Sequence, residues 1–132
     1  MRILITGAAG FIASTTAEKL LAQGHEVVGI DNFDPFYDRK LKERNLAALR
    51  DHDRFTFAEG DILDRDLVKK LLAEPPCDGM IHLAALAGVR PSIQRPMDYQ
   101  RVNIEGTMNL LEAARELGTK RLVLASSSSV YG

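Results

Sequence analysis

The sequence predicts an α/β fold built on a doubly wound parallel sheet. Five short apolar runs recur along the chain, and helix-like segments separate them. A Gly-Ala-Ala-Gly turn follows the first run and opens a helix, and Asp31 ends the second run. Repeated strand–helix units connect by right-handed crossovers, which produce a parallel sheet covered by helices on both faces. The default strand order is 3-2-1-4-5, the Rossmann-type arrangement.

Each element is predicted from a local pattern. Strands are expected where short apolar runs occur, over residues 2–6, 26–31, 54–58, 78–84 and 121–125. Helices are expected where apolar residues recur at helical spacing, over residues 11–23, 40–50, 65–73 and 96–117. Gly24 and Gly118 follow the first and the last helix as stop signals. The apolar residues of the last helix are expected on one face: Ile104, Met108, Leu111, Ala114 and Leu117.

Length, composition and charge restrict the class of protein. The chain has 132 residues, of which 45% are hydrophobic and 27% charged, and this is typical of one globular domain. Lys and Arg total 17 against 18 Asp and Glu, so the formal net charge of −1 gives no electrostatic case for binding nucleic acid or an anionic membrane. No apolar stretch approaches the roughly 20 residues of a spanning helix, and no signal peptide is recognisable.

The cysteine and histidine residues exclude two further classes. Cys77 is the single cysteine, so no intrachain disulfide forms, and a cytoplasmic location is the natural interpretation. His25, His52 and His82 lie far apart, and none has a Cys or carboxylate at ligand spacing. We therefore expect no metal site.

The first strand–helix turn has the pattern of a phosphate-binding loop. Gly7 and Gly10 allow a tight turn and a close backbone approach to a pyrophosphate, which would sit at the N-terminus of the following helix. Ala13 is the third small residue, which lets helix and strand pack closely. A plain glycine turn is the alternative, but the preceding strand and the following helix favour the binding loop.

Two aspartates at strand ends are candidate ligands for an adenosine. Asp31 lies 21 positions after Gly10, where a carboxylate accepts hydrogen bonds from ribose hydroxyls and repels the extra phosphate of NADP. The alternative for Asp31 is a turn cap with Asn32. Asp61, in a Gly-Asp-Ile sequence, could bind the exocyclic amine of adenine or cap the helix that begins near Asp64. These two interpretations of Asp61 stay open.

Two further loops follow buried strands at the same edge. Residues 83–88 are small or apolar, and they leave room for a ligand or act as packing spacers. The four serines of residues 126–129 follow the fifth strand. Their hydroxyls could bind a substrate oxygen, and this position argues against a serine-rich linker.

These motifs together resemble the extended short-chain dehydrogenase/reductase family, specifically its NAD-dependent nucleotide-sugar epimerases and dehydratases. The resemblance covers the whole chain and rests on residues 6–12, 60–62, 82–85, 103–107 and 126–132. Within that family, residues 31–38 and 87–93 are similar to the UDP-glucuronate 4-epimerases.

The resemblance implies an isomerase that acts by transient oxidation at C4 of a UDP-sugar. NAD takes a hydride from C4 while a tyrosine removes the hydroxyl proton, and the 4-keto sugar turns over before the hydride returns. Ser127 matches the catalytic Ser/Thr position, Ser128 and Ser129 lie near the sugar, and Arg90 belongs to a substrate-lining loop unless it is a surface arginine. The residues at cofactor positions are Gly7, Gly10, Phe11, Ile12, Asp31, Asn32, Asp61, Ile62, Leu83, Ala84, Ala85 and Asn103.

The Tyr-x-x-x-Lys pair of the family is not among the 132 residues. Leu41 stands four positions after Tyr37, Asn103 stands four after Tyr99, and Tyr131 is the third tyrosine. We therefore expect residues 1–132 to be a C-terminally truncated NAD-binding domain that is inactive alone and lacks the substrate domain. We expect it to self-associate through the strand 121–125, whose apolar side chains are left in water, through the helix 96–117, or through both. The alternatives are a stand-alone dinucleotide-binding module and a fragment of a related UDP-sugar epimerase, dehydratase or decarboxylase.

Overall fold

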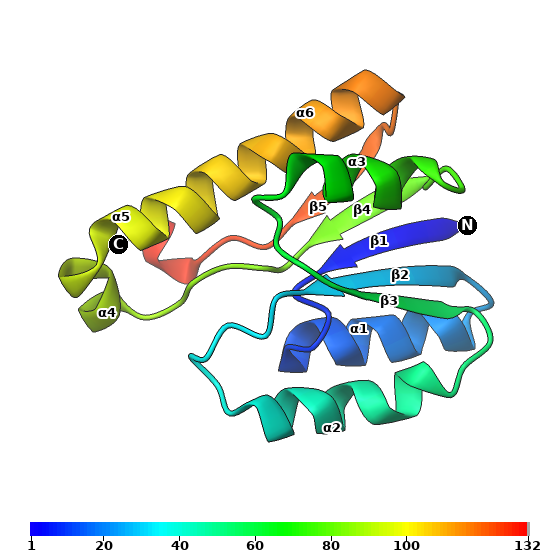
Figure 1. Cartoon of the computed structure of the whole chain (residues 1–132), viewed down its shortest axis with the longest axis horizontal. Helices are drawn as coiled ribbons and strands as arrows, with labels where there is room; N and C mark the ends of the chain where they lie inside the picture. Colours follow the sequence, from blue (N-terminus) through cyan, green and yellow to red (C-terminus); the bar gives the residue numbers. More distant parts are fainter. Residues whose placement is uncertain (132) are drawn as a thin grey trace.

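The five predicted strands form one parallel sheet with the predicted order β3-β2-β1-β4-β5 (Figure 1). The structure, a computed structural model, describes residues 1–131 apart from the side chains of Ser128 and Ser129. In the register of the sheet, Leu4 lies opposite Val28 on one side and Met80 on the other. The strands are β1 (Arg2–Thr6), β2 (Glu26–Asp31), β3 (Phe55–Glu59), β4 (Gly79–His82) and β5 (Arg121–Leu124).

Helices cover both faces of the sheet, as the crossover rule predicts. Figure 1 shows α1 (Phe11–Ala22) and α2 (Arg39–Arg50) on one face, with α3 (Arg65–Ala73) and α6 (Thr107–Leu117) on the other. The predicted helix over residues 96–117 is continuous, but it has three parts: α5 (Pro96–Tyr99), the π-helix η1 (Gln100–Gly106) and α6. Two short elements were not predicted: α4 (Val89–Gln94) and the 3₁₀ turn η2 (Ser128–Tyr131).

The sheet separates two apolar cores because alternate strand residues point to opposite faces. On the side of α1 and α2, Ile5 and Val27 are buried with Leu46 and Phe55. On the side of α3 and α6, a second cluster is buried: Leu4, Val28, Ile30, Val68, Leu72, Met80 and Leu110. Both clusters lie next to the strands, so the loops at the strand ends are held on a rigid base.

The predicted apolar face of the last helix is wrong in its orientation. Ala114 is buried together with Leu110 and Ala113, but four of the five predicted residues are exposed: Ile104, Met108, Leu111 and Leu117. Small residues face the core because the helix packs closely against Ile62. A Cβ on Gly106 would lie 2.6 Å from Cδ1 of Ile62. The wider π turn also rotates α6 relative to the residues before it, so a constant helical spacing across η1 does not hold.

Strand β5 is exposed although its sequence is apolar. Leu122, Val123 and Leu124 are 39%, 61% and 53% exposed, which agrees with the expectation that apolar side chains of this strand lie in water. β5 is the last strand of the sheet and pairs only with β4 among the residues described. Within residues 1–131, no helix has both the length and the apolar character that crossing a membrane requires.

Candidate functional site

The glycine turn after β1 packs directly against the loop after β4. Gly7 has φ +72°, and a Cβ at this position would lie 2.9 Å from the backbone nitrogen of Ala84. Glycine is therefore required for both the backbone conformation and the close contact. The Ala8 N–H donates to the Ile30 carbonyl (3.1 Å) and the Gly10 N–H to the Gly7 carbonyl (2.8 Å), which ties the turn to β2 and closes it.

The N-terminus of α1 leaves backbone donors without acceptors inside the helix. The Ser14 N–H donates to the Gly10 carbonyl, whereas the N–H groups of Phe11, Ile12 and Ala13 precede the first intrahelical bond. Among the described residues no side chain caps this end, and the first turn holds no acidic residue. These donors and the helix dipole together favour an anion at this place.

Asp31 is buried at the end of β2 and faces the glycine turn. Its Oδ2 accepts from the Ala9 N–H (3.1 Å), and its Oδ1 accepts from the Phe33 N–H (2.8 Å). The ammonium of Lys42, on α2, lies 3.1 Å from Oδ1, and both side chains of this ion pair are almost wholly buried. Asp31 therefore closes the turn at Phe33, as the alternative interpretation held, and it also holds the glycine turn through Ala9.

Lys42 and Asn45 are site residues that the sequence reasoning missed. Asn45, also on α2, donates from Nδ2 to the Ala9 carbonyl at 2.9 Å. A signal was available for Lys42, because it stands four and seven positions before the buried Leu46 and Leu49 and so shares the inward face of α2. A lysine on a buried helix face implies a buried acidic partner.

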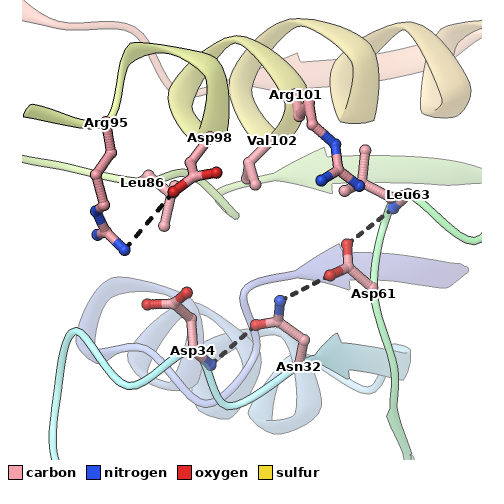
Figure 2. A pocket seen from close by; sticks show the side chains of 9 residues that line it. All are labelled: Asn32, Asp34, Asp61, Leu63, Leu86, Arg95, Asp98, Arg101 and Val102. Carbon is pink, nitrogen blue, oxygen red and sulfur yellow. Dashed lines mark hydrogen bonds and ion pairs between the residues drawn. The ribbon is translucent and has the colours of Figure 1, made fainter. Parts of the chain in front are cut away.

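A pocket of about 210 Å³ lies between the loops that follow β2, β3 and β4 and the helices α5 and η1 (Figure 2). Asn32 and Asp61 point toward each other at its base, where Asn32 Nδ2 donates to Asp61 Oδ2 at 2.9 Å. Two of the predicted cofactor residues, Asn32 and Asp61, line it. The complete lining is Asn32, Asp34, Asp61, Leu63, Leu86, Arg95, Asp98, Arg101 and Val102.

The structure excludes one of the two interpretations of Asp61. The N-cap of α3 is Asp64, whose Oδ1 accepts from the Leu67 N–H at 3.0 Å. Asp61 instead accepts from the Leu63 N–H through Oδ1 (2.9 Å), and its other oxygen lies toward the pocket with Asn32. The helix-cap interpretation of Asp61 is therefore wrong. Ile62 is buried near Gly106 and does not line the pocket.

The loop after β4 is held by side chains rather than by backbone pairing. The N–H groups of Leu83 and Ala84 both donate to Thr6 Oγ1, at 3.1 and 3.0 Å. Asn103, on η1, binds both backbone groups of Leu86: Oδ1 accepts from the N–H (2.8 Å) and Nδ2 donates to the carbonyl (3.0 Å). The pocket wall formed by Leu86 thus depends on Asn103.

The residues predicted to bind substrate lie apart from this pocket. Arg90 is exposed on α4 and does not line the pocket. Ser127 is exposed before η2, where its carbonyl accepts from the Val130 N–H at 3.2 Å. The side chains of Ser128 and Ser129 lie outside the described part of the chain. Within that part, no three His, Cys, Asp or Glu side chains group as metal ligands would.

The strand order, with the glycine turn and the pocket at the carboxyl ends of the strands, defines a Rossmann-type domain of the kind that binds dinucleotides. The family model described as GDP-mannose 4,6 dehydratase matches residues 4–132. The chain therefore belongs to this family of NAD-dependent epimerases and dehydratases.

Curated relatives match over nearly the whole chain. The probable UDP-glucuronate 4-epimerase of Rhizobium meliloti (strain 1021) is 46% identical over 134 residues, covering 100% of this chain and 39% of the relative. The UDP-glucuronate 4-epimerase of Thermodesulfobacterium geofontis (strain OPF15) is 44% identical over 128 residues, covering 97% and 40%. The chain thus spans about two fifths of the length of these relatives.

Solved structures of similar proteins contain NAD. UDP-glucuronic acid 4-epimerase from Bacillus cereus, in complex with UDP-glucuronic acid and NAD, matches with a TM-score of 0.90 and 42% identity, over 100% of this chain and 42% of that chain. UDP-glucose-4-epimerase from Stenotrophomonas maltophila, with bound NAD and formylated UDP-arabinopyranose, matches with a TM-score of 0.87 and 36% identity, over 100% and 38%.

Proposed function

We propose that this chain is the NAD-binding part of a nucleotide-sugar 4-epimerase whose substrate is UDP-glucuronate. The observation that carries the proposal is the uncapped N-terminus of α1, which the Gly7 turn holds against Ala84 and the buried Asp31. NAD in two similar structures and the similarity to UDP-glucuronate 4-epimerases support it.

In this proposal the glycine turn binds the pyrophosphate of the cofactor. Gly7 and Gly10 bring the backbone close, and the N–H groups of Phe11 and Ile12 donate to the phosphate oxygens. No acidic side chain in the first turn of α1 opposes this charge. Ser14 does not take part, because its N–H is already bonded to Gly10.

The adenosine lies in the pocket between the strand ends. Asp31 and Asn32 bind the ribose, and the carboxylate of Asp61, with Ile62 next to it in the chain, takes the exocyclic amine of adenine. Asp61 already accepts from Asn32 and Leu63 and has further lone pairs available, so it suits this role. Along the remaining cofactor, the small loop after β4 allows a close approach through Leu83, Ala84 and Ala85, and Asn103 holds that loop in place.

On the substrate side, bound NAD supplies the hydride acceptor for C4 of the sugar. Ser127 holds the reacting oxygen as the catalytic serine, and Ser128 and Ser129 contact the sugar. Arg90 faces the carboxylate or the diphosphate of UDP-glucuronate. Turnover also requires a general base and its lysine, a Tyr-x-x-x-Lys pair that is not among the 132 residues.

Location and assembly complete the proposal. A cytoplasmic location agrees with Cys77 as a buried free thiol, whose pKa is raised mainly by burial. Self-association is supported by the exposed apolar residues of β5 and of the long helix, such as Val123 and Ile104.

Calorimetric titration with NAD and with NADP tests the cofactor assignment. The unmodified chain should bind NAD more tightly than NADP, and Asp31→Ala should weaken NAD by about tenfold or more, because hydrogen bonds to a charged group contribute roughly 1.5–3 kcal/mol. Asp31→Ala should also reduce the difference in affinity between NAD and NADP. Asp66→Ala, an exposed change on α3, is the control. Equal affinity for both cofactors in the unmodified chain would contradict the assignment.

A further inference from the structure

His82 is a buried titratable side chain that the proposed reaction does not use. It ends β4, it is 3% exposed, and its ring bridges two other elements. Nδ1 lies 2.7 Å from Oγ1 of Thr6 on β1, and Nε2 lies 3.0 Å from Oγ1 of Thr107 at the start of α6. Both ring nitrogens are thus satisfied by hydroxyl groups.

The hydroxyl of Thr107 determines which ring nitrogen carries the proton. Thr107 Oγ1 lies 2.7 Å from the Asn103 carbonyl, an acceptor only, so the single hydroxyl proton goes there. Thr107 can then only accept from His82, which places the ring proton on Nε2. The neutral ring has a bare Nδ1, and Thr6 must donate its hydroxyl proton to it.

This direction leaves both lone pairs of Thr6 Oγ1 for the loop after β4. They accept the N–H groups of Leu83 and Ala84, at 3.1 and 3.0 Å. The opposite tautomer fails at both ends: Nδ1–H would need a third acceptor site on Thr6, and a bare Nε2 would face an oxygen whose proton is already used. A doubly protonated ring meets the same obstacle at Thr6.

We infer that His82, as the neutral Nε2–H imidazole, is a positioning residue that holds the loop of residues 83–86 against the glycine turn by relaying hydrogen-bond direction from Thr107 to Thr6. The role of this loop toward a cofactor rests on the proposed function, whereas the relay itself does not. Burial of the ring lowers the pKa of His82 and so favours the neutral form.

The relay connects the two sides of the candidate site. At one end, Thr6 sets the position of Ala84, whose backbone nitrogen would lie 2.9 Å from a Cβ on residue 7. At the other end, the carbonyl of Asn103 accepts from Thr107 while its side chain holds Leu86 at the wall of the pocket. The N–H groups of Leu83, Ala84 and Leu86 are all bonded to side chains, so they are not the donors for a phosphate.

The first test reads the tautomer and the loop in the full 132-residue chain without cofactor. Nitrogen-15 NMR of the imidazole should show a protonated Nε2 and a bare Nδ1 at neutral pH. Thr107→Val, which keeps the shape of the side chain but removes the hydroxyl, should speed amide exchange at Leu83 and Ala84 by about tenfold, although both amides are bonded to Thr6 and not to Thr107. Thr107→Ser should restore slow exchange, and the amide of Leu4 serves as an internal reference.

A second test uses the two amide substitutes for the ring. His82→Asn places a carbonyl acceptor near the position of Nδ1 and should keep the Leu83 and Ala84 amides protected. His82→Gln keeps only the donor toward Thr107 and should lose that protection. A purely space-filling role for His82 predicts the same exchange for both variants.

The outcomes are distinct. A proton on Nδ1, or unchanged exchange in Thr107→Val, overturns the relay whatever the cofactor result. Thr107→Val should also weaken NAD about threefold to tenfold, with Thr107→Ser restoring affinity. If the unmodified chain binds no NAD, the proposed function fails, and the exchange data still decide the relay. If Thr107→Val does not fold, the tautomer and the Asn–Gln comparison at His82 decide it.

Discussion

Replacing Lys42 by methionine should strongly destabilise the fold, because it removes the counter-ion of a buried carboxylate. Lys42 Nζ lies 3.1 Å from Asp31 Oδ1, and the two side chains are only 10% and 6% exposed. Removing one partner of a buried ion pair typically costs 3–5 kcal/mol. Asp31 keeps its bonds to the Ala9 and Phe33 N–H groups, so the lower end, about 3 kcal/mol, is expected. At roughly 4 °C per kcal/mol for a domain of this size, Tm should fall by about 12 °C.

Urea denaturation followed by far-ultraviolet circular dichroism measures this change, since the chain has no tryptophan for a fluorescence assay. Lys40→Met is the matched control, because Lys40 lies on the same helix but is exposed. The double variant Asp31→Asn with Lys42→Met should lose less than the sum of the single changes, since neither charge is then left unpaired. A free energy of unfolding for Lys42→Met within about 0.5 kcal/mol of the Lys40→Met value would refute the reasoning.

Four further outcomes are expected. Burial lowers the pKa of His82 in the folded state, so the unfolded chain takes up a proton at a higher pH than the folded chain does. The free energy of unfolding should therefore decrease as the pH drops below about 6.5. Urea midpoints at about pH 7.5 and 5.5 measure this decrease, and His82→Asn is the comparison. Gly106→Ala should cost about 1–3 kcal/mol, because its Cβ would meet Ile62, and calorimetry checks this. Light scattering should find species above 14.6 kDa that Ile104→Lys with Met108→Lys reduces; a clean monomer of the unmodified chain at high concentration would contradict the exposed-face argument. Chromatography should find no conversion of UDP-glucuronate by the 132-residue chain at rates normal for an enzyme, because the Tyr-x-x-x-Lys base is missing.

The strand order and the glycine turn could be predicted because their signals are local. Each apolar run is short enough for one strand, and the helical spacing between runs requires crossovers of one hand. Gly7 and Gly10 follow directly from the same reasoning, since a turn that joins β1 to α1 at close approach needs residues without a Cβ. The position of Asp31 at the end of β2 is equally local, and it was found from its distance along the chain.

Only the tertiary structure decided which side chains these positions meet. Asp61 and Asp64 are both acids before α3, and the choice of helix cap depends on the backbone path between them. Lys42 pairs with Asp31, 11 positions earlier, and His82 forms a hydrogen bond with Thr6, 76 positions earlier. Spacing along one element shows which residues share a face, but the partner of that face comes from another element. Burial then gives each contact its energy, because a polar group removed from water depends on the one partner that it meets.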